Sequence, residues 1–177
     1  MTATPDRAGR ILTVCLGNIC RSPTAEAALV EAAEAAGVAL EVASAGTGDW
    51  HVGQPPHAPM RAAAAAAGLT LRGTAQQVDA ELLAWADLVV VMDRSNLADV
   101  TRIAETAGVD TPVALFRTFD LTDAPSVPAE APEVPDPYGG DDEDYAHVVE
   151  LCRRTARGLV AAWPGPDVRI SASGGPG

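Results

Sequence analysis

The sequence predicts a single α/β domain of three layers, in which helices flank a four-stranded parallel sheet. Three observations support this fold class. Four short apolar runs are typical of buried parallel strands, and helical segments alternate with them along the chain. A length of 177 residues suits one domain with a sizeable core. We expect residues 10–163 to form this domain, between flexible tails at 1–9 and 164–177.

The predicted elements follow one another in a regular order. The strands span residues 10–16, 40–45, 87–92 and 113–117, and the helices span residues 24–36, 59–67, 78–85, 95–108 and 145–163. Ser22 is the expected N-cap of the first helix, because Pro23 suits the first turn, and Gly37 ends this helix. Five prolines make residues 118–144 a long loop. Strands that alternate with helices predict a parallel sheet covered on both faces.

The charge balance limits the partners of this chain. Its net charge is −12 at neutral pH, and we expect neither nucleic acid nor an anionic membrane as a partner, because both bind cationic surfaces. All 12 basic residues are arginine, which together with the high alanine content indicates a bacterial genome rich in GC. Three cysteines without an export signal or a membrane-length apolar stretch predict a cytoplasmic protein with free thiols.

The stretch from Cys15 to Ser22 joins the first strand to the first helix. A turn at a helix N-terminus presents N–H groups that have no partner within the helix, and these groups and the helix dipole favour phosphate. Gly17 permits close approach of the backbone, and Asn18 tolerates the left-handed conformation of such turns. Arg21 offers a bidentate clamp for phosphate oxygens. The same positive field favours the thiolate form of Cys15, which would be aimed at phosphorus.

Other uses of this loop fit the sequence less well. The ATP-binding pattern G-x-x-x-x-G-K-[ST] is absent, and the chain has no lysine. Cys15 and Cys20 lack further ligands at the spacing of a metal site, and the histidines do not form a metal triad: His51, His57 and His147. We therefore expect no metal and no other cofactor, and we expect each histidine to lie on the surface or to pack.

Four segments resemble those of one enzyme family. VCLGNICRSPTAEAAL at 14–29 is similar to the active-site segment of the low-molecular-weight protein tyrosine phosphatases. SAGTGDWHVG at 44–53, DLVVVMDRSNL at 87–97 and VPDPYGG at 134–140 follow in the order expected for the family. The resemblance covers residues 10–163. It implies an α/β fold with a phosphate-binding loop after the first strand, and a hydrolase that acts on tyrosine-phosphorylated proteins and small aryl phosphates. We expect this enzyme to bind phosphate-like oxyanions and to be a monomer.

The resemblance implies that three residues carry the chemistry. Cys15 is the nucleophile and forms a phosphocysteine intermediate, Arg21 binds phosphate and stabilises the transition state, and Asp136 is the general acid. These roles are chemically coherent, because expelling a phenolate needs a proton as its bond to phosphorus breaks. Asp136 would then activate the water that hydrolyses the intermediate.

The resemblance implies binding roles for the neighbouring residues. Ser22 hydrogen-bonds the nucleophile, whereas Trp50 and Tyr138 wall the aromatic entrance of the cleft. Cys20 matches a thiol that pairs reversibly with the nucleophile under oxidation. The residues that bind the substrate phosphate are those of the loop: Leu16, Gly17, Asn18, Ile19 and Cys20.

Two features depart from the family pattern. Gly139 follows Tyr138 where many members have a second tyrosine, so the pocket wall is expected to be thinner. The segment LRGTAQQ at 71–77 lacks a histidine that often supports the phosphate loop. The loop is then expected to be held by Asn18, Ser44 or other groups.

Three further residues have simpler interpretations. Trp85 and Trp163 lie on apolar helix faces and are expected in the core. Asp93 follows an apolar strand, where it either supports the site or caps the next helix.

Two other functions stay open alongside the phosphatase. A thiol-dependent arsenate reductase has a similar loop and fold but needs additional redox cysteines, and none occurs between Cys20 and Cys152. A non-catalytic module that binds phosphotyrosine is the second alternative, although it would not need both Cys15 and Asp136.

Overall fold

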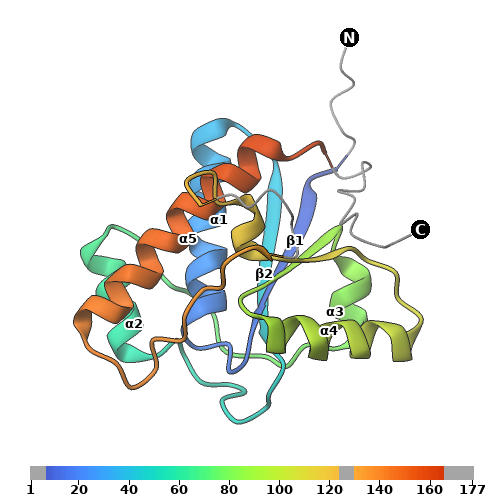
Figure 1. Ribbon diagram of the computed structural model, residues 1–177, viewed down its shortest axis with the longest axis horizontal. Coiled ribbons are helices and arrows are strands. Elements are labelled where there is room, and N and C mark those ends of the chain that lie inside the picture. Colours follow the sequence, from blue (N-terminus) through green and yellow to red (C-terminus); the bar gives the residue numbers. More distant parts are fainter. Residues whose placement is uncertain (1–6, 124–129, 166–177) are drawn as a thin grey trace.

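One parallel sheet of four strands organises the protein, and the strand order is β2–β1–β3–β4 (Figure 1). The computed structural model describes residues 7–123 and 130–165. The strands are β1 (Gly9–Cys15), β2 (Leu40–Gly46), β3 (Leu88–Val91) and β4 (Val113–Leu115). All three neighbouring pairs are parallel, so the carboxyl ends of the strands share one edge of the sheet. Strand β1 is central, with β2 and β3 on either side.

Helices cover both faces of this sheet and make three layers, as the sequence predicts. The helices are α1 (Arg21–Ala36), α2 (Ala58–Ala66), α3 (Ala80–Trp85), α4 (Arg94–Ala107) and α5 (Asp142–Ala162), with a 3-10 helix η1 at Phe116–Phe119. In Figure 1, α1, α2 and α5 lie on one side of the sheet, and α3 and α4 lie on the other. The side chains of β3 pack on both faces of the sheet. Leu88 and Val90 belong to one buried cluster, and Val89 and Val91 belong to the other.

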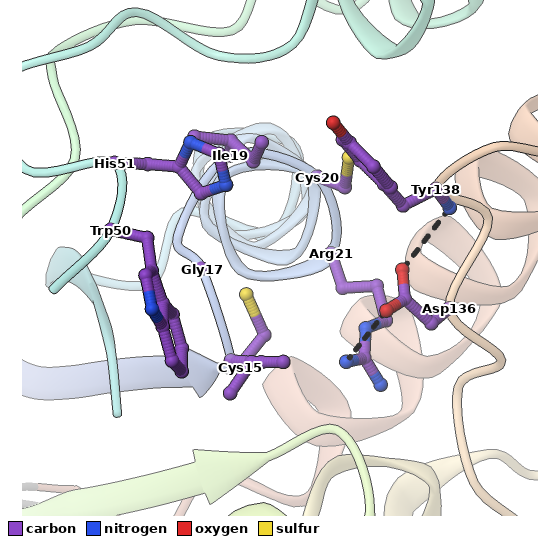
Figure 2. Close-up of a pocket in the computed structure, with 10 residues that line it drawn as sticks. Cys15, Gly17, Ile19, Cys20, Arg21, Trp50, His51, Asp136 and Tyr138 are labelled. Carbon is purple, nitrogen blue, oxygen red and sulfur yellow. Dashed lines mark hydrogen bonds and ion pairs between the residues drawn. The ribbon is translucent and has the colours of Figure 1, made fainter. Parts of the chain in front are cut away.

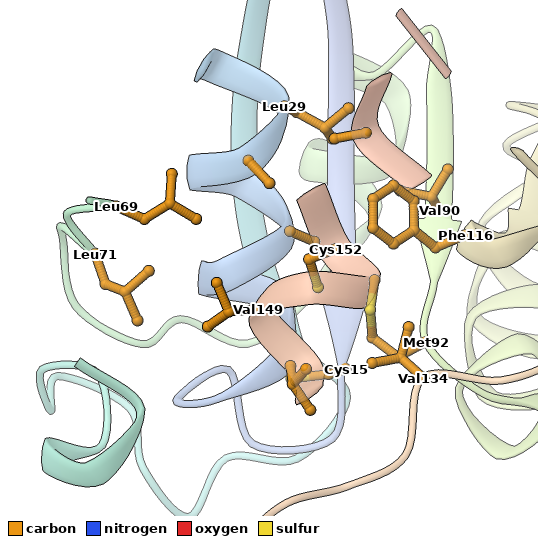
Figure 3. Packing of buried hydrophobic residues seen from close by; sticks show 14 of the residues in the cluster. Cys15, Leu29, Leu69, Leu71, Val90, Met92, Phe116, Val134, Val149 and Cys152 are labelled. Carbon is orange, nitrogen blue, oxygen red and sulfur yellow. The ribbon is translucent and has the colours of Figure 1, made fainter. Parts of the chain in front are cut away.

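The larger buried cluster reaches the carboxyl edge of the sheet (Figure 3). Phe116 and Cys152 are fully buried in it, and the same cluster includes Cys15, Met92 and Val134. The loop after β1 and the segment around Val134 therefore rest on one continuous core. Trp163 packs against this cluster and Trp85 packs against the other, and both are partly buried.

Several boundaries differ from the sequence prediction for identifiable reasons. Ser22 is not the N-cap of α1, which begins at Arg21 and has Cys20 in the capping position without a side-chain cap. The Ser22 hydroxyl bonds groups of the preceding loop instead. Strand β4 is shorter than predicted, because Phe116 and Arg117 already belong to η1. Helix α5 begins earlier, because Asp141 and Asp144 form a capping box at its start.

Most of the predicted tails and part of the predicted proline-rich loop fall outside the described residues, which omit 1–6, 124–129 and 166–177. The predicted end of the N-terminal tail at residue 9 is wrong, because Gly9 already belongs to β1. Within the described N-terminal residues, Arg7 donates to both carboxylate oxygens of Asp87 at 2.9 and 2.7 Å. Across residues 7–123 and 130–165, no helix combines the length and the apolar character that crossing a membrane requires.

Candidate active site

The turn between β1 and α1 forms the floor of the site. Asn18 has a φ of 57°, and it is the one non-glycine residue with a positive φ in the described part of the chain. This confirms the predicted left-handed position. The carbonyls of Cys15, Leu16 and Ile19 accept hydrogen bonds from the N–H groups of residues 47, 48 and 57 at 2.9, 2.9 and 2.8 Å. Because the C=O and N–H of one peptide unit point in opposite directions, the N–H groups of Leu16, Gly17 and Cys20 point away from these supporting residues.

The backbone of β2 supports this turn closely. Gly46 pairs with Cys15 in the parallel register. A Cβ atom on Gly46 would lie 2.7 Å from the carbonyl oxygen of Leu16 and 3.0 Å from the nitrogen of Asn18. The turn therefore fits only against a residue without a side chain. Sequence reasoning did not identify this role of Gly46.

Two donors surround the sulfur of Cys15. The backbone N–H of Asn18 donates to Sγ at 3.2 Å, and the Ser22 hydroxyl lies 3.0 Å from Sγ. The Ser22 oxygen accepts from the Asn18 side-chain amide at 2.8 Å, and its proton has two acceptors within reach, Cys15 Sγ and the carbonyl of Ala45 at 3.3 Å, of which Sγ is the nearer. The geometry thus suits a sulfur that carries negative charge, and it places Ser22 where the resemblance predicts.

Asn18 also connects the turn to the segment that lacks the family histidine. Its side-chain oxygen accepts a hydrogen bond from the backbone N–H of Gln76 at 2.9 Å. The Gln76 side chain donates in turn to the carbonyl of Ser44 at 3.0 Å. Asn18 therefore holds the loop as expected, and a backbone N–H of the 71–77 segment is its partner. Sequence reasoning did not identify Gln76, because its contact with Asn18 is made by the main chain.

Arg21 is buried and held from two directions. Its Nη1 donates to Asp93 Oδ2 at 2.7 Å and to the carbonyl of Val134 at 3.1 Å. Its Nη2 lies 3.7 Å from Asp136 Oδ2. Burial alone would lower the pKa of Arg21, but the hydrogen bond to Asp93 and the charges of Cys15 and Asp136 raise it overall. The guanidinium therefore stays charged at the end of the cleft.

Asp93 has both of the roles considered from the sequence. Its Oδ2 accepts from Arg21, while its Oδ1 accepts from the N–H of Asn96 at 2.8 Å. The Asn96 side chain accepts from the N–H of Asp93 and completes a capping box at the start of α4.

A cleft of about 230 Å³ opens above the turn (Figure 2). The residues that line it are Cys15, Leu16, Gly17, Ile19, Cys20, Arg21, Trp50, His51, Asp136 and Tyr138. Trp50 and Tyr138 face each other across its mouth, and both are more than half exposed. Of the predicted site residues, Asn18 and Ser22 do not line the cleft but lie beneath the turn. The structure thus brings residues 15–21, Trp50 and the 136–138 stretch together.

His51 lines the cleft although the sequence predicts only a surface or packing role. A Cβ on Gly17 would lie 3.0 Å from the His51 ring, so the imidazole rests on the turn. Its Nδ1 lies 2.9 Å from Oε1 of Gln54. His57 stacks near Tyr138 with 4.9 Å between ring centroids. Its predicted packing role is confirmed, and the ring supports the single tyrosine of the wall. His147 is exposed, as expected.

The carboxyl group of Asp136 reaches the cleft from the side opposite Trp50 (Figure 2). Its Oδ1 accepts a hydrogen bond from the N–H of Tyr138 at 3.1 Å, and the side chain is 49% exposed. Pro137 between them is buried. Asp136 is therefore open to a bound molecule and to water.

The other two thiols are not poised to ionise. Burial raises the pKa of Cys20 to about 12, and the charges of Cys15 and Asp136 add to this effect. Burial also raises the pKa of Cys152 to about 12. All three cysteines are free. In the described ranges, 7–123 and 130–165, no three histidine, cysteine, aspartate or glutamate residues are grouped so that they could hold a metal ion.

This arrangement matches a known family along most of the chain. A family model described as low molecular weight phosphotyrosine protein phosphatase matches residues 10–164. The chain belongs to this family.

Individual low-molecular-weight phosphatases support the assignment. The low molecular weight protein-tyrosine-phosphatase of Streptomyces coelicolor is 37% identical over 155 residues, which cover 86% of this chain and 92% of the relative. The human low molecular weight phosphotyrosine protein phosphatase is 31% identical over 153 residues, or 85% of this chain and 92% of the human protein. A crystal structure of a protein tyrosine phosphatase from Entamoeba histolytica has a TM-score of 0.77 and 27% identity, and covers 87% of this chain and 96% of that one.

Proposed function

We propose that this chain is a protein tyrosine phosphatase that transfers the phosphoryl group of phosphotyrosine to Cys15 and then to water. The observation that carries the proposal is the cleft itself. Cys15 lies at its base, Asp136 lies at its side, and Arg21 lies close to both. A nucleophile, a phosphate-binding cation and a proton donor are therefore placed around one volume that suits a phosphate ester.

In the first step, the phosphate oxygens occupy the turn and accept hydrogen bonds from its N–H groups and from Arg21. These donors oppose the charge that develops on the equatorial oxygens in the transition state. The Cys15 sulfur attacks phosphorus, and the bond from phosphorus to the tyrosine oxygen breaks. Asp136 gives its proton to the departing phenolate oxygen, because an unprotonated phenolate is a poor leaving group.

In the second step, the Asp136 carboxylate accepts a proton from a water molecule. The oxygen of this water attacks phosphorus, and the bond between sulfur and phosphorus breaks. Inorganic phosphate leaves, Cys15 returns as a thiolate held by Asn18 and Ser22, and Asp136 is again protonated. Each group thus returns to its starting state after one turnover.

The walls of the cleft support phosphotyrosine as the substrate. Trp50 and Tyr138 stand above the turn on opposite sides, so a flat ring fits between them while its phosphate reaches Cys15. The shorter side chain of phosphoserine would leave this aromatic volume empty. The protein substrate would approach the mouth, where Trp50 is 68% exposed and Tyr138 is 58% exposed.

We further propose a monomeric enzyme of the bacterial cytoplasm. Every residue to which the proposed steps assign a role comes from one chain, so the reaction does not require a second copy. The free thiols suit a reducing compartment. The 37% identity to the Streptomyces coelicolor relative, compared with 31% for the human one, favours a bacterial source.

Hydrolysis of aryl phosphates tests this function. Phenyl phosphate and 4-nitrophenyl phosphate are supplied to the purified protein with a chelator present. We expect Cys15→Ser to abolish turnover of both. We expect Asp136→Asn to slow the hydrolysis of phenyl phosphate, which has the poorer leaving group, by roughly a hundredfold or more. The hydrolysis of 4-nitrophenyl phosphate should slow less.

The matched control is Arg102→Ala, which removes a largely exposed arginine paired with Asp99 on α4. It should leave both rates unchanged. Undiminished turnover by Cys15→Ser would contradict the mechanism. Turnover of arsenate with a thiol donor that exceeds aryl phosphate hydrolysis would favour the arsenate reductase instead.

A further inference from the structure

The segment that carries Asp136 has few ways to attach itself to the rest of the protein. Between residues 131 and 137 the sequence reads APEVPDP, so three of the seven residues are prolines without an N–H group. One backbone hydrogen bond ties the described part of this segment to the sheet, from the N–H of Val134 to the carbonyl of Met92 at 2.9 Å. A strand-like ladder cannot form there, and other groups must satisfy and hold the carbonyls.

Arginine side chains donate hydrogen bonds to the carbonyls of this segment at three points. Arg94 Nη2 donates to the carbonyl of Ala131 at 2.9 Å. Arg117 Nη1 donates to the carbonyl of Glu133 at 3.0 Å, and Arg21 Nη1 donates to the carbonyl of Val134 at 3.1 Å. The Glu133 side chain also binds Arg94, because its Oε2 accepts a hydrogen bond from the Arg94 backbone N–H at 2.6 Å. The guanidinium groups replace the backbone donors that the prolines remove.

Arg117 is itself held by buried charges. Its Nε and Nη2 donate to Asp120 at 3.3 and 3.1 Å, and its Nη2 donates to Asp123 at 2.7 Å. Asp120 is fully buried and also accepts two hydrogen bonds from Arg154 of α5, at 2.9 and 2.8 Å. This cluster gives the Arg117 guanidinium one orientation, with Nη1 toward the segment. Arg94 differs, because its side chain is 49% exposed.

We propose that Arg117 and Arg94 are positioning residues for proton transfer by Asp136. The Asp136 side chain is half exposed, so packing does not orient it. Its Oδ1 is held by the backbone N–H of Tyr138, so its place in the cleft follows from the backbone of its own segment. Pro135 and Pro137 restrict φ on both sides of it. The arginines hold the backbone of residues 131–134, and this backbone therefore sets the position of the Asp136 carboxyl group. This inference rests on the proposed function, and specifically on the role of Asp136.

The test compares two substrates in several variants. In Arg94→Ala and Arg117→Met, phenyl phosphate hydrolysis should fall by roughly ten- to a hundredfold, because a displacement of about 1 Å is enough to cost this much. Hydrolysis of 4-nitrophenyl phosphate should fall by less than about threefold, because its leaving group needs little help from a proton. Arg117→Lys, which keeps one donor, should restore part of the rate. Arg102→Ala is the control and should change neither rate.

Combination with Asp136→Asn separates positioning from loss of folding. If the arginines act through Asp136, then adding Arg94→Ala or Arg117→Met to Asp136→Asn should cause no further fall in phenyl phosphate hydrolysis. Additive losses, or equal losses for both substrates, would overturn the inference. Arg94→Ala keeps the test valid if Arg117→Met does not fold, because Arg94 is not buried.

The outcome also distinguishes this inference from the proposed function. If Asp136→Asn alone leaves phenyl phosphate hydrolysis unchanged, Asp136 is not the general acid and the proposed function fails. If Asp136→Asn slows that substrate while both arginine variants keep the wild-type ratio of the two rates, only the positioning inference fails.

Discussion

Asp93 joins the buried Arg21 to a helix cap, because its two carboxylate oxygens serve different partners. One oxygen accepts from Arg21 at 2.7 Å and the other accepts from the N–H of Asn96 at 2.8 Å. The side chain of Arg21 is 4% exposed. A buried cation needs a paired anion, so Asp93 stabilises the charge of Arg21 and also caps α4 just after β3.

Two substitutions of Asp93 separate these roles. Asparagine caps helices about as well as aspartate but carries no charge. Asp93→Asn should therefore keep α4 and weaken the hold on Arg21, with a loss in kcat/KM of roughly tenfold. Asp93→Ser keeps a capping oxygen that is too short to reach Arg21, and its loss should be larger. Steady-state kinetics and thermal unfolding of both variants check this. Equal losses of activity and stability in the two variants would contradict a separate effect on Arg21.

A methyl group at position 46 should disturb the phosphate loop without touching a catalytic side chain. A Cβ there would lie 2.7 Å from the Leu16 carbonyl oxygen, so the turn must move. We expect Gly46→Ala to reduce affinity for inorganic phosphate and to lower kcat/KM by roughly a hundredfold. Glu41→Ala, on the exposed part of the same strand, is the control. The expectation fails if phosphate inhibits Gly46→Ala as strongly as it inhibits the wild type.

Mild peroxide should join Cys15 to Cys20. Both thiols line the same cleft, and the high pKa of Cys20 keeps it protonated, so Cys15 is the thiol that reacts first. Peroxide oxidises Cys15 to a sulfenic acid; the Cys20 sulfur then displaces its oxygen, and water leaves. Two of the three thiols should disappear, and a reductant should restore activity. In Cys20→Ser, a second peroxide molecule can oxidise the unprotected sulfenic acid to the sulfinic acid, with water as the by-product, and inactivation should become irreversible. Full recovery of that variant with a reductant would contradict protection by Cys20.

Stability should depend on pH through Asp120. Burial alone would raise the pKa of Asp120, but hydrogen bonds from Arg154 and Arg117 outweigh it and lower the pKa. A lowered pKa stabilises the fold at any pH above the unfolded value of about 3.9, and this contribution is lost as pH falls through the folded value. Asp120→Asn should therefore reduce the free energy of unfolding by about 3 kcal/mol at neutral pH. Below pH ~3.9 its difference from wild type should shrink.

Urea unfolding at several pH values measures this effect. Asp99→Asn removes the partner of an exposed arginine on α4 and should cost less than about 0.5 kcal/mol at every pH. A difference between Asp120→Asn and the wild type that stays constant from neutral to strongly acidic pH would show that ionisation of Asp120 does not matter.

Local pattern was enough to predict the strands, the helices and the turn after β1, whereas Trp50, Asp136 and Tyr138 were assigned to the cleft only through the family resemblance. Cys15, Asn18 and Arg21 stand at positions whose backbone or charge requirements are visible in the sequence. Gly46, His51 and Gln76 were missed, because their contacts depend on how β2 and the following segment fold over the turn. The two possible roles of Asp93 could not be separated, because both of its oxygens are used. The arginine contacts to residues 131–134 arise only in three dimensions.

The two Nη atoms of Arg21 have different surroundings. Nη1 is taken by Asp93 and Val134, whereas Nη2 faces Asp136 and the space above the turn. The rotamer freedom of this long side chain is therefore lost when the chain folds. In the proposed mechanism, an arriving phosphate therefore meets a guanidinium that is already ordered, and binding does not cost the entropy of ordering that group.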